Sequence, residues 1–438
     1  MDLLKDNVGK LYRKFFIASF GSALIACIYG LVDMAMVGQY HGPDGSAAMA
    51  VIAPIWNIIY SFGLLCGIGG SVIYAVARGE RDDVKAANGY FTSAFILGAI
   101  WALILWVLVW VCEEPLLRLF GANDALMPLC KEYMVAPKLT VPVYVFINLL
   151  SSFLRNDGDP GRATKAVIFG GIFNVFGDYF FVFTLDMGIK GAGIATAMGA
   201  STSVLVMLTH FISKKNTLKF VKPLRILNSF KMISINGFSS FIVDVAMGIA
   251  TMLFNRRVME YLGTDALAVY GVIVVVGTLV QCCSYGIGQA AQPVISRNFG
   301  AGLTDRIKTM LKYNIITAAV FGAIWTVLSM AMPQVFIKLF MTPTPEVLSI
   351  APGIIRIYAI SFVLLPFNIY STYYFQAIMR AKISLIASVA RGIVISGALI
   401  LLLPVAFGGN AVWWAMPITE AVVFVYSAVM MKKVKLSR

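Results

Sequence analysis

The sequence predicts an all-α integral membrane protein with twelve transmembrane helices in two six-helix bundles. Three observations lead to this fold class: an apolar composition, regularly recurring apolar runs, and an internal repeat. The 438 residues are 59% hydrophobic and only 13% charged, and their mean hydropathy is +0.84. A soluble domain of this size could not bury so much apolar surface.

Apolar runs of roughly 20 residues recur along the whole chain, and each matches the ~30 Å hydrocarbon core of a bilayer. The basic stretch Met1–Lys14 leads into a run too long for a signal-peptide core, so we expect the first span to be retained. The predicted spans are 12–36, 47–76, 88–112, 133–155, 163–185, 189–213, 229–254, 267–290, 311–337, 350–377, 384–406 and 410–431.

The basic residues are distributed unequally between the two sets of connections. The set that includes both termini carries 27 of the 35 lysines and arginines, and the opposite set carries 8. This asymmetry follows the positive-inside rule. We therefore expect a multi-pass protein of the cell inner (plasma) membrane with both termini in the cytoplasm. The net charge of +14 is then a topology signal, and we expect no nucleic-acid partner.

The two halves of the chain share several short motifs at an offset of about 220 residues. Gly42-Pro-Asp44 matches Gly263-Thr-Asp265, and Gly67-Ile-Gly69 matches Gly286-Ile-Gly288, in the same order. Six spans per half keep both copies in the same orientation. The repeat is therefore expected to be parallel, with a pseudo-two-fold axis along the membrane normal.

This repeat divides the chain into two lobes. We expect a six-helix N-terminal lobe over residues 1–213, a basic cytoplasmic linker over 214–228, and a six-helix C-terminal lobe over 229–438. Substrate sites in proteins with such repeats lie near the middle of the bilayer, between the halves or within one lobe.

Four carboxylates lie inside predicted spans: Asp33, Asp178, Asp244 and Glu420. A bare carboxylate in hydrocarbon costs several kcal/mol, so such acids usually face a cavity or a partner and mark an ion or substrate path. Asn174 precedes Asp178 by one helical turn, which places both side chains on one helix face.

The acids are not repeated in the second half. At the repeat offset, the counterparts of Asp33, Asn174 and Asp178 are Phe254, Ser396 and Ile400, in that order. If one lobe handles a coupling cation, the sequence favours the N-terminal lobe.

Signals of catalysis are few. The chain has no Gly-x4-Gly-Lys-Ser/Thr motif, and its two histidines, His41 and His210, are far apart. We therefore expect that the protein is not an enzyme. An integral-membrane enzyme or a receptor is the rival from another class, and the repeat and the missing catalytic cluster count against it.

Several strings in chain order resemble the multidrug and toxic compound extrusion (MATE) family. They are Val32-Asp-Met-Ala-Met-Val-Gly38, Arg155-Asn-Asp-Gly-Asp-Pro160, Asn174-x3-Asp178, Gly288-Gln-Ala-Ala-Gln-Pro293 and Arg297-Asn-Phe-Gly300. The resemblance runs nearly the full length of the chain, and the turn that starts at Arg155 looks like the bacterial MepA-like branch.

The resemblance implies two lobes in a V shape around a central cavity, and export of cationic, amphipathic compounds against inward H⁺ or Na⁺ flow. It also implies an N-lobe cation site formed by Asp33, Asn174, Asp178 and Thr196, with Tyr133 in the same network. Such an oxygen shell could hold Na⁺ or a proton, and the sequence does not choose between them.

Two positions depart from the family pattern. The first proline is Pro43, beyond the first span, which puts a proline-kink mechanism in doubt. The tenth span has Asn368 where another branch has an acid, which puts a C-lobe Na⁺ site in doubt.

We therefore predict a secondary active exporter that works by alternating access, with H⁺ or Na⁺ as its coupling ion and no other cofactor. Its expected partners are drug-like organic cations and the lipid bilayer, and we expect a monomer. Asp244 and Glu420 are predicted to face the substrate cavity, with an interhelical hydrogen bond as the alternative for each. The nearest rival is a lipid-linked saccharide flippase, which would need cationic residues in its cavity. The spans contain acids and almost no Lys or Arg, which favours cationic cargo.

Overall fold

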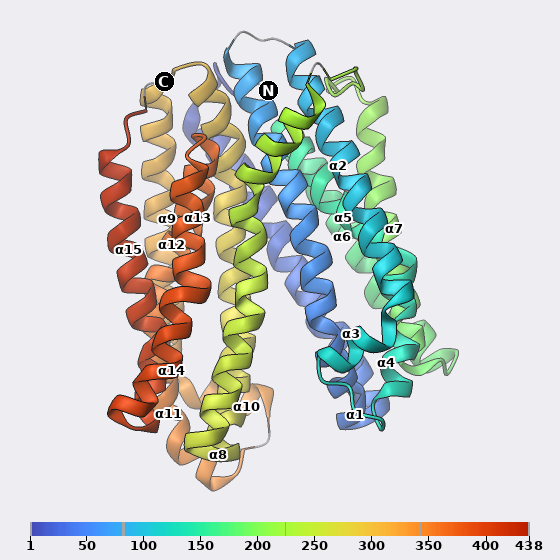
Figure 1. The fold of residues 1–438 in the computed structure, drawn as a ribbon, viewed down its shortest axis with the longest axis vertical. Coiled ribbons are helices and arrows are strands. Elements are labelled where there is room, and N and C mark those ends of the chain that lie inside the picture. Colours follow the sequence, from blue (N-terminus) through green and yellow to red (C-terminus); the bar gives the residue numbers. More distant parts are fainter. Residues whose placement is uncertain (1, 81–83, 224, 342, 437–438) are drawn as a thin grey trace.

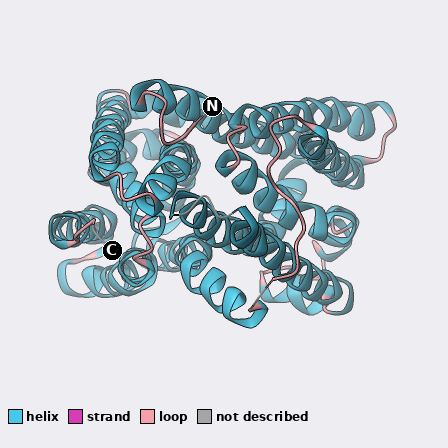
Figure 2. Cartoon of the chain, turned by 90° about the horizontal axis from the view of Figure 1, so that it is seen from above, coloured by secondary structure: helices cyan, strands magenta, loops and turns pink. Residues whose placement is uncertain are grey.

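The computed structural model describes residues 2–80, 84–223, 225–341 and 343–436. Helices account for the secondary structure, and the described residues contain no strand (Figure 2). The first half contains α1 (Val8–Glu80), α2 (Val84–Val111), α3 (Glu113–Leu119), α4 (Met127–Tyr133), α5 (Val135–Asn156), α6 (Pro160–Asp178), η1 (Tyr179–Thr184), α7 (Gly188–Leu208) and η2 (Thr209–Ile212). The second half contains α8 (Ile226–Gly300), α9 (Thr304–Ala331), α10 (Pro333–Phe340), α11 (Pro345–Ala359), α12 (Ser361–Ala377), α13 (Ala381–Val389), η3 (Ala390–Val394), α14 (Ile395–Phe407), η4 (Gly409–Trp414) and α15 (Ala415–Lys433).

The first and the eighth helix are each two membrane passes joined at a glycine. Gly42 has φ 64° and ψ −147°, and Gly263 has φ 82° and ψ −169°, so the chain turns at both positions. Glycine suits them because a side chain disfavours positive φ. Among the described residues, eleven segments are long and apolar enough to cross a membrane, and the 75-residue α8 counts once among them. Dividing α8 at Gly263 gives the twelve predicted passes.

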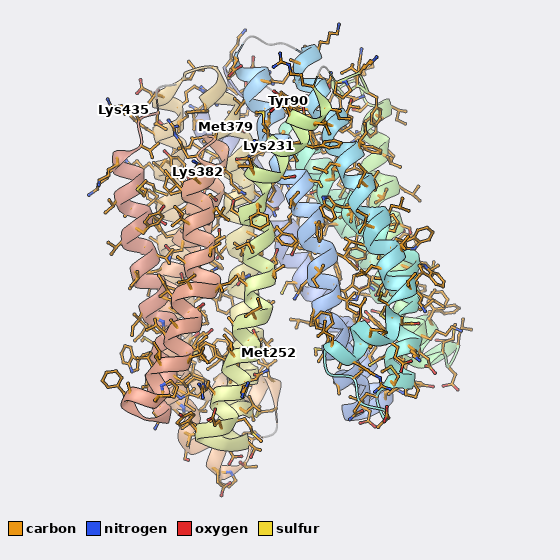
Figure 3. The ribbon with its side chains drawn as sticks, viewed as in Figure 1. Tyr90, Lys231, Met252, Met379, Lys382 and Lys435 are labelled. Carbon is orange, nitrogen blue, oxygen red and sulfur yellow. The ribbon has the colours of Figure 1, made fainter. Side chains whose placement is uncertain are left out.

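The helices form two bundles that lie close together at one end and diverge toward the other (Figure 1). We call helices α1–α7, with η1 and η2, the N-lobe, and helices α8–α15 the C-lobe. Both termini lie at the end where the lobes meet, which we call the terminal end; the opposite end is the far end. Lys231, Lys382 and Lys435 lie near the terminal end, whereas Met252 lies further along α8 toward the far end (Figure 3).

Glycines let the two lobes touch through their backbones near the terminal end. A Cβ atom on Gly237 of α8 would lie 2.0 Å from the carbonyl oxygen of Leu65 in α1, and one on Gly300 would lie 2.1 Å from that of Val76. Any larger side chain at these positions would force the lobes apart. The terminal end is therefore closed by contacts that only glycine permits.

The turn after α5 fastens the start of the interlobe linker. The Asp157 carboxylate accepts the Thr217 backbone N–H at 2.9 Å and the Thr217 hydroxyl, and it lies 2.7 Å from His210 Nε2. Burial raises the pKa of Asp159, but Lys215, Arg162 and His210 outweigh burial and hold that pKa below its usual range. The sequence of this turn predicts no role beyond its likeness to a family motif, yet its carboxylates hold the linker against the N-lobe.

Candidate cation and substrate site

A cavity of about 480 Å³ lies within the N-lobe and is closed on one side by the second half of α8. Among the described residues that line it, Asp33 is the one carboxylate and Arg155 the one guanidinium. Tyrosines contribute much of the remaining wall, with small residues between them. The tyrosines are Tyr29, Tyr60, Tyr133, Tyr144 and Tyr285.

Asp33 is buried, with 7% of its surface exposed. The Tyr133 hydroxyl, at the end of α4, donates a hydrogen bond to Asp33 Oδ2 at 3.1 Å. The Thr196 side chain of α7 also interacts with this carboxylate. The structure therefore brings together three of the predicted site residues, which come from three separate helices. Asp33 Oδ1 has no hydrogen-bond partner among the described residues.

Asn174 and Asp178 extend this cluster along α6. Asn174 Nδ2 lies 3.4 Å from Thr196 Oγ1, while Asn174 Oδ1 has no partner among the described residues. Asp178 is fully buried, and both of its carboxylate oxygens are also without a partner there. Asn174 lines the cavity, whereas Asp178 lies behind the wall. Both residues lie on α6, one helical turn apart.

The cluster therefore presents several buried oxygens that lack hydrogen-bond donors. Leaving such atoms unpaired costs about 1–3 kcal/mol each, and more when they are charged. Carboxylate, amide and hydroxyl oxygens are hard ligands that suit Na⁺, and a carboxylate also accepts a proton. In the described part of the chain, no group of three or more His, Cys, Asp or Glu side chains is placed to hold a metal ion. The unpaired oxygens of Asp33, Asn174 and Asp178 are thus chemically suited to a small hard cation or a proton.

Asp244 does not form the wall of this cavity. It is 9% exposed, and the Tyr285 hydroxyl donates to its Oδ1 at 2.7 Å. Gln281 Nε2 in turn donates to the Tyr285 oxygen at 2.6 Å. Tyr285 lines the cavity and Asp244 lies behind it. The predicted place of Asp244 on the cavity surface is corrected to one layer behind the surface.

Glu420 lies inside the C-lobe, away from the cavity. It is fully buried and forms an ion pair with Arg391, whose Nε lies 2.7 Å from Glu420 Oε1. Asn368 Nδ2 donates to Glu420 Oε2 at 2.7 Å. The structure therefore shows the alternative that the sequence left open, a contact between helices. Arg391, counted above with the basic residues of a connection, lies within the bundle between α13 and α14.

Sequence reasoning also missed the position of Arg155. This residue lies in the last turn of α5 and was read as part of a polar turn, yet it is 7% exposed and lines the cavity. A signal was present in the spacing, because Tyr144, Asn148, Ser151 and Arg155 recur on one face of a helix.

Two apolar six-helix bundles, with a polar cavity beside their interface, define a class of multi-pass membrane proteins with an internal repeat. The MatE family model matches residues 18–180 and 238–401, two stretches that begin 220 residues apart. The chain belongs to the MatE family. The predicted membership of the MATE family is confirmed.

Curated relatives and solved structures agree with this assignment. The chain is 23% identical to the multidrug export protein MepA of Staphylococcus saprophyticus over 95% of this chain and 92% of the relative, and 24% identical to that of Staphylococcus haemolyticus over the same shares. One solved structure, described as an outward-facing multidrug resistance MATE family transporter, matches with a TM-score of 0.89 at 22% identity, over 98% of this chain and 97% of that one. A MOP superfamily transporter from Pyrococcus furiosus matches with a TM-score of 0.88 at 22% identity, over 99% and 98%. The predicted fold class is confirmed.

Proposed function

We propose that this protein is a secondary active multidrug exporter that moves organic cations and amphipathic drugs outward in exchange for inward H⁺ or Na⁺. Membership of the MatE family and the similarity to proteins named for multidrug export support this proposal. The observation that carries it is the set of unpaired, buried oxygens of Asp33, Asn174 and Asp178 beside a cavity large enough for a drug-sized molecule. Enzymatic catalysis is not part of the proposal.

The coupling step would take place at Asp33, whose carboxylate both the ion and the substrate could reach. Asp33 and Asp178 repel each other electrostatically, so a proton or Na⁺ bound between or upon them removes that repulsion. Asp33 also lines the cavity and can attract a cationic substrate. Ion and substrate would then compete for the same negative charge, which is the requirement for exchange. Tyr133 and Thr196 would orient the carboxylate for either ligand.

The arrangement of the lobes supports alternating access. The lobes touch through Gly237 and Gly300 at the terminal end and diverge at the far end (Figure 1). If the termini are cytoplasmic, as the basic residues predict, this shape is closed to the cytoplasm and open to the outside. Rocking of the two lobes about the cavity would exchange the closed and open ends.

The flippase alternative has one observation in its favour, the Arg155 guanidinium in the cavity. A pyrophosphate carries several negative charges, and a single cation opposed by the Asp33 carboxylate would compensate little of that charge. Export of drug-like molecules is therefore the better-supported function.

Ethidium efflux from cells that express the protein tests the proposal. We expect one of two treatments to stop efflux. If collapse of the pH gradient stops it, the coupling ion is H⁺; if removal of Na⁺ stops it, the coupling ion is Na⁺. Efflux that continues after both treatments would show that neither ion drives transport. Cells that do not express the protein provide the control for passive leakage.

A further inference from the structure

Arg155 is a buried cation that faces the cavity. It continues a stripe of α5 residues that line the cavity at helical spacing, including Tyr144, Asn148 and Ser151. Only 7% of the Arg155 surface is exposed. A guanidinium so far from bulk water is costly unless it has an anionic or hydrogen-bonding partner.

No carboxylate of the described chain pairs with Arg155. The two nearest in sequence, Asp157 and Asp159, are already engaged: Asp157 with Thr217 and His210, and Asp159 with Arg162. The side chains of Tyr60 and Tyr373 lie near the Arg155 guanidinium. Its five N–H donors are therefore available to a molecule in the cavity.

Arg155 and Asp33 mark opposite ends of the cavity. The Ser22 hydroxyl donates to Thr164 near the start of α6, which places Ser22 near the terminal end. Arg155 lies at this end too, in the last turn of α5. Asp33 lies about three helical turns, or roughly 16 Å, further along α1. The cavity is thus positively charged at one end and negatively charged at the other, with tyrosines between them.

We propose that Arg155 forms an anion subsite that binds the carboxylate group of amphipathic zwitterions, with their cationic group toward Asp33. A guanidinium binds a planar carboxylate through two parallel hydrogen bonds, a geometry that an ammonium cannot reproduce. The inference rests on the proposed function, and it adds a subsite for those amphipathic substrates that carry an acid as well as a cation.

Equilibrium binding of two matched dyes tests the subsite. Rhodamine B carries a xanthylium cation and a free carboxylate, whereas its ethyl ester carries the same cation and no acid. Each is titrated into the full-length protein in phosphatidylcholine nanodiscs, which hold no anionic lipid, and binding is followed by fluorescence polarisation. Arg155→Gln should weaken rhodamine B binding about 10-fold and change ester binding by less than about 2-fold.

Two further variants sharpen the result. Arg155→Lys keeps the positive charge but cannot form the two parallel hydrogen bonds, so it should retain only part of the rhodamine B affinity. Arg13→Gln removes one exposed basic residue of α1 and should leave both affinities unchanged. If Arg155→Gln does not fold, benzoate is titrated against wild-type protein, where it should displace rhodamine B and not the ester.

The outcomes separate this inference from the proposed function. Equal weakening of both dyes would mean that Arg155 stabilises the end of α5 rather than binding an acid. Ester binding without rhodamine B binding would overturn the subsite and leave the export of cations standing. Failure of wild-type protein to bind either dye would count against the multidrug cavity itself, and against the subsite with it.

Discussion

At repeat-related positions, the N-lobe has acidic residues and the C-lobe has apolar ones. Where the N-lobe has Asp33, the C-lobe has Phe254, which is 1% exposed and stacks on Tyr270 with ring centroids 4.9 Å apart. Where the N-lobe has Asp178, the C-lobe has Ile400, which is fully buried. One scaffold thus holds an ion-binding candidate in one copy and an apolar core in the other.

The C-lobe does bury charge, but it pairs that charge. Glu420 meets Arg391 and Asn368, whereas Asp178 has two unpaired oxygens among the described residues. A paired buried charge has its desolvation partly compensated, whereas an unpaired one is the better candidate for binding a cation. Burial of an acid in a membrane helix therefore does not by itself indicate function, because the groups that pair with the acid determine what it can bind.

The largest expected effect is on the N-lobe acids. Asp178→Asn keeps the side-chain shape but removes the charge, so gradient-driven efflux should be abolished while expression survives. Asp33→Asn should be equally severe, because Asp33 is buried and hydrogen-bonded rather than placed at the interface. Vesicle transport driven by an imposed H⁺ or Na⁺ gradient measures both. Wild-type efflux by a well-expressed Asp178→Asn variant would contradict the N-lobe assignment.

The next effect is on stability in the C-lobe. Glu420→Ala leaves Arg391 buried without its partner, which should destabilise the protein by about 3–5 kcal/mol. Replacing both residues with Met should restore most of this loss. Apparent Tm values in detergent test the pair, with transport by the double variant as the control. If that stable double variant loses its ion dependence, the C-lobe takes part in coupling and the comparison fails.

Much of the fold follows directly from the sequence. The spans match the apolar runs because a helix satisfies its own backbone hydrogen bonds in hydrocarbon. The turns at Gly42 and Gly263 follow from the repeat. The relative placement of Asn174 and Asp178 can also be predicted from the sequence, because their spacing puts them one helical turn apart.

The residue that a buried side chain contacts on a neighbouring helix cannot be predicted from the sequence in the same way. Spacing places Glu420 on a helix face but does not say which neighbour that face meets. Arg391 within the predicted span 384–406 was the available signal for a pair. The hydrogen bond from Tyr285 to Asp244 joins two separate membrane passes, and no sequence pattern encodes it. Arg155 follows an apolar run, so it reads as a loop residue until the three-dimensional cavity is known.

A smaller effect is expected at Asp244. Asn at this position can still accept the Tyr285 hydrogen bond, and it faces the cavity only through that tyrosine. Asp244→Asn should therefore raise the apparent KM for cationic substrates by less than about 5-fold, which corresponds to about 1 kcal/mol. Neutral substrates and the ion requirement should be unaffected. A shifted ion dependence in vesicle transport across pH and Na⁺ would instead place Asp244 in the coupling site.

The smallest effect is expected at the C-lobe counterpart of Asp178. Ile400→Val removes one buried methylene and should cost about 0.5–1.5 kcal/mol of stability. Because Ile400 has no charge to exchange and lies in an apolar core, the dependence of efflux on pH and Na⁺ should match that of the wild type. Efflux is measured across the same range of pH and Na⁺ as for Asp178→Asn, at matched expression. An Ile400→Val variant that alters ion dependence as strongly as Asp178→Asn would show that coupling is spread over both lobes.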